Sequence, residues 1–101
     1  MSKHTPGPWT AVKNSAYWEI DGPDDFGTVA DACASSAGEP DFGRSMALGE
    51  ANARLIAAAP DLLSACKAAE YAANHVDCVS AMQHALPAIR AAIAKAEGGA
   101  A

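Results

Sequence analysis

The stretch EANARLIAAAPDLL, from Glu50 to Leu63, decides the fold of this 101-residue chain. Up to Ala59 its residues favour a helix, and Pro60 ends that helix because proline lacks an amide hydrogen and disfavours helical backbone in the residue before it. Pro60 and Asp61 also suit the first turn of another helix, where a missing amide costs nothing and an acid complements the helix dipole. The stretch therefore predicts two consecutive helices with almost no loop between them.

Helices are expected throughout the chain after residue 44. We place the first from an N-cap at Ser45 to Ala59, and the second from Pro60 to about Asn74. Each later helix shows one apolar stripe that predicts a packing seam. The second stripe is interrupted by Pro87, which predicts a kink or a break into two shorter helices. The stripes consist of Leu62, Leu63, Cys66, Ala69 and Ala73, and of Val79, Met82, Leu86, Ile89, Ile93 and Ala96.

Strands are expected before residue 44, where polar and apolar residues alternate between turn residues. The alternating segments are Trp9 to Val12, Tyr17 to Ile20 and Thr28 to Cys33. Residues 21–25 supply a turn in which Gly22 is free to take a positive φ, and residues 34–43 are expected to form an exposed loop. The sequence predicts a single α+β domain: a short three-stranded antiparallel sheet (1–44), then an alanine-rich bundle of three or four helices (45–97) and a frayed tail (98–101).

The composition limits how large a core the chain can build. Alanine supplies 26 of the 101 residues, whereas Leu, Ile, Val and Phe together supply 15. Small domains bury only about two thirds of their unfolded surface, so a core this poor in bulky side chains is marginal. Alanine-rich helix faces can gain further burial against copies of themselves. We therefore expect a homo-oligomer, with clefts at the boundaries between subunits.

Charge and cysteine usage narrow the possible partners. The net charge of −5 comes entirely from the first 50 residues, and no cluster of Lys and Arg suited to duplex nucleic acid is present. No apolar run approaches the roughly 20 residues that span a bilayer. The three cysteines have no paired spacing, and no signal peptide precedes them, so we expect a reduced, cytoplasmic setting.

Catalysis and metal binding are not indicated. Zinc could be bound by His75, Asp77, Cys78 and His84, but no second closely spaced pair of Cys or His is present. The segment around His75 and Cys78 is better explained as the end of one helix and the start of the next. Cys66 is expected to be buried, and the acidic residues between 21 and 25 to form a solvated turn without calcium. No positioned base, nucleophile or cofactor motif is identifiable, so we expect a protein that is not an enzyme and that has no metal and no cofactor.

One group of residues has the chemistry of an anion site. Glu50 and Arg54 form a favourable surface pair, but Arg44 and Ser45 at a helix start could join Arg54 in binding a phosphate. Trp9 is expected mainly to anchor the core, and Asn52 to pair with the backbone before Trp9. The candidate ligand-binding residues are Trp9, Tyr17, Trp18, Arg44, Ser45, Asn52 and Arg54.

Two segments make the chain recognisable. TPGPW at Thr5 to Trp9, together with EANARLIAAAPDLL at Glu50 to Leu63, resembles a family of small phage and prophage proteins. The C-terminal segment from Leu86 to Ala96 extends this resemblance, whereas residues 21–43 match no motif of that family. The resemblance implies a phage accessory gene product and supplies no biochemical activity.

Two functions follow as hypotheses, by analogy with other small phage proteins that act against host defence. The first is a non-catalytic protein that binds and sequesters a host nucleotide signal, a cyclic nucleotide or an ADP-ribose derivative, at clefts between subunits. The second is an inhibitor, such as an anti-CRISPR protein, that binds a host defence protein through the acidic half of the chain. In the second case, neutralising Asp24, Asp25, Asp31 and Asp41 should weaken binding. A structural phage protein without a ligand is the third possibility.

Overall fold

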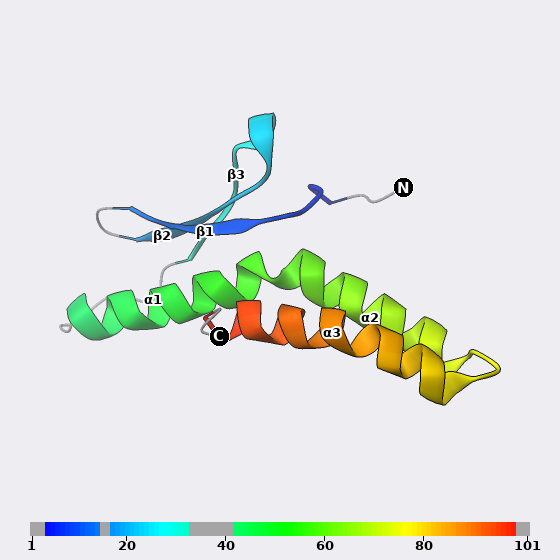
Figure 1. Cartoon of the computed structure of the whole chain (residues 1–101). Coiled ribbons are helices and arrows are strands. Elements are labelled where there is room, and N and C mark those ends of the chain that lie inside the picture. Colours follow the sequence, from blue (N-terminus) through cyan, green and yellow to red (C-terminus); the bar gives the residue numbers. More distant parts are fainter. Residues whose placement is uncertain (1–3, 15–16, 33–41, 99–101) are drawn as a thin grey trace.

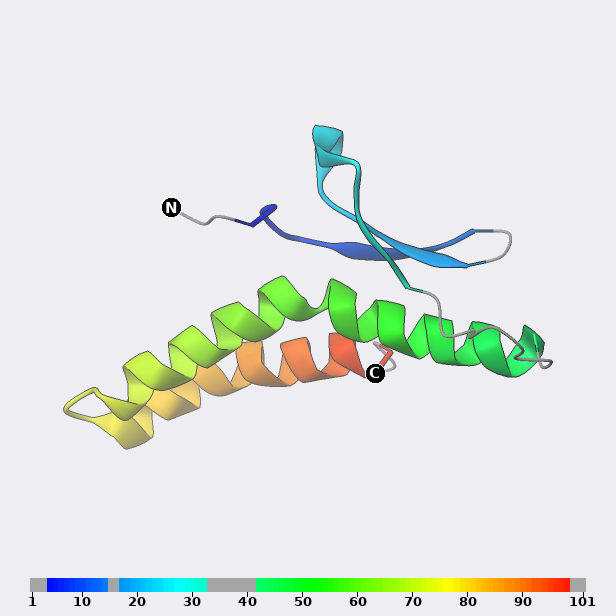
Figure 2. The same cartoon turned by 180° about the vertical axis from the view of Figure 1, so that it is seen from behind.

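Three strands precede three helices in the computed structural model, which describes residues 4–14, 17–32 and 42–98, and only the backbone of residues 25 and 42–46. The elements are β1 (Thr10–Lys13), β2 (Trp18–Asp21), the short 3₁₀ helix η1 (Asp24–Phe26), β3 (Thr28–Ala32), α1 (Phe42–Ala57), α2 (Ala59–Ala73) and α3 (Cys78–Ala96). The predicted α+β order is confirmed. The sheet lies on one side of α1, and α2 and α3 form a hairpin that extends away from it (Figures 1 and 2).

The sheet is an antiparallel meander with strand order β1-β2-β3. Ile20 lies opposite Ala11 on β1 and Ala30 on β3, so these three side chains share one face. That face packs against α1, because Ile20 forms a buried cluster with Ala53 and Ala57 of the helix. Ile20 is the largest fully buried side chain among the described residues. The core between the sheet and α1 is therefore small, and the two layers lie close together.

The TPGPW segment closes one end of this core. Trp9 is half-buried against the cluster around Ile20, and its indole N–H donates to the carbonyl oxygen of Thr5 at 3.1 Å. A Cβ added to Gly7 would lie 2.8 Å from the Cβ of Pro60, so only glycine allows this approach. The two recognisable segments of the sequence thus meet in space, and the predicted anchoring role of Trp9 is confirmed.

The helical hairpin is held by alanines. Ala65 and Ala72 of α2, and Ala85 and Ala92 of α3, are buried at seven-residue spacing. A repeat of seven keeps one line of each helix facing its partner, and alanine lets the two backbones approach closely. The predicted seams were therefore wrong: the stripes of larger side chains lie beside the line of contact, and Cys66, predicted to be buried, is exposed.

Three other expectations need correction. Helix α1 begins at Phe42, so Ser45 is an internal residue rather than an N-cap, and the predicted loop ends earlier. Positive φ values occur at Asp24 and Gly27, not at Gly22. Helix α3 runs through Pro87 without a break, because Pro87 and Gln83, whose carbonyl loses its partner, both lie on the exposed side of the helix. Most of the predicted loop, residues 34–41, lies outside the described residues.

The molecule is long for its size. Its principal extents are 55, 28 and 23 Å, and its radius of gyration is 16.3 Å, whereas a compact chain of this length has a radius of about 13 Å. Within the described residues, no helix has the length and apolarity needed to cross a bilayer.

Candidate functional site

The outer face of the sheet, on the side away from α1, is acidic. Side chains alternate along a strand, so Glu19 and Asp21 point away from α1 while Ile20 points toward it. On β3, exposed Asp31 lies directly opposite Glu19, and the described part of this face holds no Lys or Arg. These acids concentrate negative charge on one exposed surface. We call Glu19, Asp21 and Asp31 the acidic sheet face.

Hydrogen bonds arrange the carboxylates of this face. Thr28 Oγ1 donates to Glu19 Oε2 at 2.7 Å, and the side-chain amide of Asn14 donates to Glu19 Oε1. The Thr28 bond lowers the pKa of Glu19, whereas hydrogen bonding with Glu19 raises the pKa of Asp21, with burial and the charge of Glu19 acting in the same direction. The surroundings thus favour the charged form of Glu19 and disfavour the charged form of Asp21.

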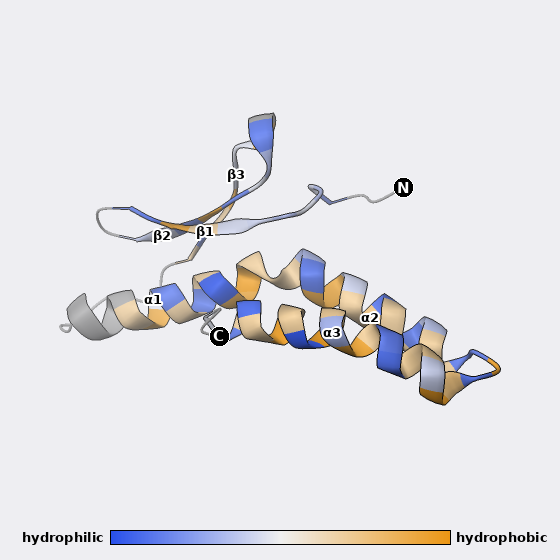
Figure 3. Cartoon of the chain, in the orientation of Figure 1, coloured by the Kyte–Doolittle hydropathy of each residue, from blue (hydrophilic) through white to orange (hydrophobic). Residues whose placement is uncertain are grey.

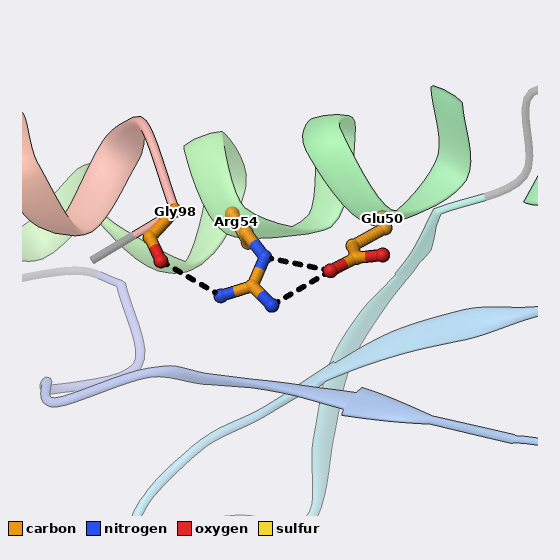
Figure 4. A network of polar contacts seen from close by, with 3 residues as sticks. All are labelled: Glu50, Arg54 and Gly98. Carbon is orange, nitrogen blue, oxygen red and sulfur yellow. Dashed lines mark hydrogen bonds and ion pairs between the residues drawn. The ribbon is translucent and has the colours of Figure 1, made fainter. Parts of the chain in front are cut away.

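Arg54 forms a second polar site, where α1 meets the C-terminal end of α3 (Figure 4). Its Nη2 donates to Glu50 Oε2 at 2.7 Å, its Nε donates to the same oxygen at 3.1 Å, and its Nη1 donates to the carbonyl oxygen of Gly98 at 3.3 Å. The guanidinium carbon also lies 6.0 Å from the ring centroid of Trp18. The predicted surface pair of Glu50 and Arg54 is confirmed, and it also links α1 to the end of the chain.

Two shallow cavities flank Arg54. One, of about 370 Å³, is lined by α1 around Glu50 and by residues 96–98, and the other, of about 210 Å³, lies between Trp9, Arg54 and Lys95. Lys95 was not a sequence candidate, and its place in the last turn of α3 was the only signal for it. Lys95 Nζ donates to Asp61 Oδ2 at 2.7 Å, so both cations at this corner are already paired with carboxylates.

The other candidate residues are spread along the molecule. Arg44 and Ser45 lie near the start of α1, about 15 Å from Arg54 along the helix axis, and their side chains are outside the description. Asn52 is exposed and makes no hydrogen bond with the described Thr5–Trp9 segment, so the predicted pairing is wrong. Tyr17 is exposed just before β2. Among the predicted residues whose side chains are described, the structure brings together Trp9, Trp18 and Arg54.

Of the four possible zinc ligands, His75, Asp77 and Cys78 lie at the tip of the α2–α3 hairpin, and His84 lies farther along α3. Asp77 caps α3, since its Oδ1 accepts a hydrogen bond from the backbone amide of Ser80 at 3.2 Å. The amide of Asp77 donates to His75 Nδ1 at 3.1 Å. Among the described residues, no group of three potential ligands is placed to hold a metal ion. The helix end and helix start predicted here are confirmed.

Comparison with known families adds one finding. The family model described as Salmonella phage P22 protein Y8K6 matches residues 1–100. The chain belongs to this family. The match spans both the sheet and the helices. No curated protein and no solved structure matches the chain. Membership of the Y8K6 family shows that the chain is a phage protein, in agreement with the resemblance seen in the sequence.

Proposed function

We propose that this member of the Y8K6 family is a non-catalytic counter-defence protein that acts in the cytoplasm of the infected bacterium by binding a host protein with a basic surface. The acidic sheet face carries the proposal. It presents Glu19 and Asp31 side by side on an open sheet whose other face is covered by α1. A basic partner would place its cations against these carboxylates.

The geometry favours a protein partner over a metal ion or a small cation. The face is broad and exposed, and η1 places exposed Asp24 beyond its edge, so the negative charge extends over a surface rather than into a pocket. Charge complementarity of this kind accelerates encounter and fixes the orientation of the partner. Of the four acids named above for neutralisation, Asp24 and Asp31 have described side chains.

Charge-neutral variants test this proposal. The tagged protein is used to isolate its partner from infected cells, and the affinity for the purified partner is then measured. Glu19→Gln with Asp31→Asn should weaken binding by about tenfold, which is about 1.4 kcal/mol, and the loss should shrink at high salt. Glu70→Gln with Glu97→Gln changes the charge equally on the exposed side of the helices. Equal affinities of the two double variants would refute the proposed surface.

A second candidate function is sequestration of a nucleotide signal at the Arg54 corner. Trp9 and Lys95 border a cavity beside Arg54, an arrangement that offers an aromatic ring and two cations to a base and its phosphates. Binding would have to displace Glu50 or Asp61 from these cations. Calorimetry against cyclic nucleotides and ADP-ribose derivatives should show heat that Arg54→Gln abolishes and Arg90→Gln leaves unchanged. A complete panel without heat would remove this candidate.

A further inference from the structure

One side of the α2–α3 hairpin is apolar along its whole length. Residues that directly follow the buried alanines, such as Cys66 after Ala65 and Ile93 after Ala92, are rotated in the same sense from the line of contact. Because the helices run antiparallel, residues displaced in this sense come to the same side of the hairpin. We call this side the hairpin face. It comprises Leu62, Cys66, Ala69 and Ala73 of α2, and Val79, Met82, Leu86, Ile89 and Ile93 of α3.

The opposite side of the hairpin confirms this geometry. Tyr71 directly precedes buried Ala72, and His84 directly precedes buried Ala85. These two residues line one cavity of about 550 Å³, together with His75 and Ser80. Residues rotated in the other sense therefore also share one side of the hairpin, where alanines alternate with Tyr71 and His84.

The hairpin face holds larger side chains than the core. Eight of the nine buried hydrophobic residues among those described are alanines, whereas on the hairpin face Val79 is 68 % exposed and Ile93 is 45 % exposed. Met82, Leu86 and Ile89 are half-buried along the same helix. In Figure 3 hydrophobic residues recur at each turn of α3. Helical hairpins normally bury such a stripe, so its exposure points to a missing partner.

The accessible surface of the chain is larger than that of a compact monomer of the same mass. The accessible surface is 6828 Å², whereas a compact monomer of this mass exposes about 5,300 Å². The difference of about 1,500 Å² exceeds the roughly 800 Å² that each partner contributes to a stable interface. The excess is therefore large enough to supply one stable interface.

The distribution of charge favours a second copy as the occupant. Helices α2 and α3 and the turn between them carry three basic and four acidic residues within 59–97, so the hairpin is nearly neutral although the chain has a net charge of −5. The charged residues border the stripe with both signs, as at Arg90 and Glu97 beside Ile93. The acidic sheet face belongs to a different part of the molecule, because the sheet packs on α1 through its other face. Two copies can therefore meet at the hairpin without bringing their excess charge together.

We propose that two copies of the chain pack through their hairpin faces and form a four-helix bundle, with the two sheets outside it. The contact is isologous, because each copy offers the same apolar stripe to the other. Alanine seams hold each hairpin together, and the larger side chains of the hairpin face form the layer between the hairpins. This inference does not depend on the proposed function, since it uses neither the acidic sheet face nor the Arg54 corner.

Sedimentation equilibrium of the full chain tests the dimer. The wild-type protein should have twice the mass of the 10.2 kDa chain. Val79→Glu with Ile93→Glu should raise the dissociation constant at least a hundredfold, while circular dichroism shows the helices retained. Ser64→Glu with His84→Glu places the same charges on exposed positions of the opposite side of the hairpin and should leave the dimer intact. A wild-type monomer at about 100 μM, or equal dissociation constants for the two double variants, would overturn the proposal.

A second measurement keeps the proposal testable if the face variant unfolds. In a Cys33→Ser background with otherwise native sequence, Cys66 lies on the hairpin face and Cys78 lies at the hairpin tip, and both are exposed in the single chain. The alkylation rate of Cys66 should fall at least tenfold as the protein concentration rises from about 1 to 200 μM, and Cys78 should change less. An unchanged rate at Cys66 over this range would contradict the dimer.

Discussion

At the scale of single residues, two glycines show how closely the sheet layer approaches the helices. Gly7 faces the ring of Pro60, a rigid neighbour that cannot turn aside. Gly49 lies inside α1 under β3, where an added Cβ would be 3.6 Å from the carbonyl oxygen of Ala32, an ordinary contact. The two positions carry the same amino acid for different reasons.

The same substitution should therefore have opposite effects at these glycines. Gly7→Ala should lower the free energy of unfolding by about 1–3 kcal/mol, because the clash forces the TPGPW segment away from α2. Gly49→Ala should raise it by about 0.5–1 kcal/mol, because alanine is the better helix former and space exists for its methyl group. Urea unfolding measures both. A Gly7→Ala protein as stable as wild type would contradict the close approach.

A pH-dependent contribution to stability comes from the acidic sheet face. Hydrogen bonding with Glu19 raises the pKa of Asp21 above its ordinary 3.8, so the charged form of Asp21 disfavours folding at neutral pH. Asp21→Asn should raise Tm at pH 7, and the gain should vanish as pH falls below about 3.8, where Asp21 is protonated in both states. Thermal unfolding followed by circular dichroism at both pH values measures this.

Glu19→Gln is the matched control with the opposite sign. The pKa of Glu19 is lowered from 4.5, so its charge stabilises the fold above that pH and this contribution is lost as pH falls. The variant should therefore lower Tm at pH 7 and match wild type in acid. If both variants shifted Tm in the same direction at pH 7, the assignment of the two carboxyls would be wrong.

At the scale of elements, the alanine seam explains how a chain with few bulky side chains forms a helical hairpin. Ala65, Ala72, Ala85 and Ala92 each bury little area, but they bring the backbones together along two full helices. Pro87 is compatible with this arrangement because it lies on the exposed side of α3, away from the seam. The hairpin thus depends on small side chains at fixed positions.

Enlarging a seam residue should separate the helices. Ala92→Leu, at a site 3 % exposed, should lower the free energy of unfolding by about 1–3 kcal/mol because the seam has no room for three further carbons. Ala91→Leu, at the exposed neighbouring position, should change it by less than about 0.5 kcal/mol. Chemical unfolding compares the two. Equal losses would show that the helix, rather than the seam, responds to the larger side chain.

At the scale of the whole molecule, two polar contacts connect the helices to one another. Arg54 joins α1 to the carbonyl oxygen of Gly98, and Lys95 joins α3 to Asp61 in the first turn of α2. Both links lie at the end of α3 nearest the sheet, while the other end of the hairpin projects away from it (Figure 1). The relative placement of sheet and hairpin therefore rests on this corner.

Removing Arg54 should loosen this corner. Arg54→Ala should lower the free energy of unfolding by about 1 kcal/mol and speed hydrogen exchange in the last turn of α3, because it removes the bonds to Glu50 and Gly98 together. Arg54→Lys should recover only part of the lost stability, since one ammonium group cannot reproduce all the hydrogen bonds of the planar guanidinium. Arg90→Ala, at an exposed position, is the control. Unchanged exchange at residues 94–97 in Arg54→Ala would show that the link carries no stability.

The sequence by itself determined the order of the elements, the close junction of α1 and α2 at Pro60, the anchoring role of Trp9 and the phage family. These follow from local backbone rules and from two recognisable segments. Only the tertiary structure decided which helix faces are buried. Alanine occurs on every face of these helices, so its positions in the sequence do not indicate which face is buried. It also decided which acids share the acidic sheet face, the bond from Arg54 to Gly98 and the pairing of Lys95 with Asp61. Contacts between residues far apart in the chain depend on how the sheet and the helices are placed in space.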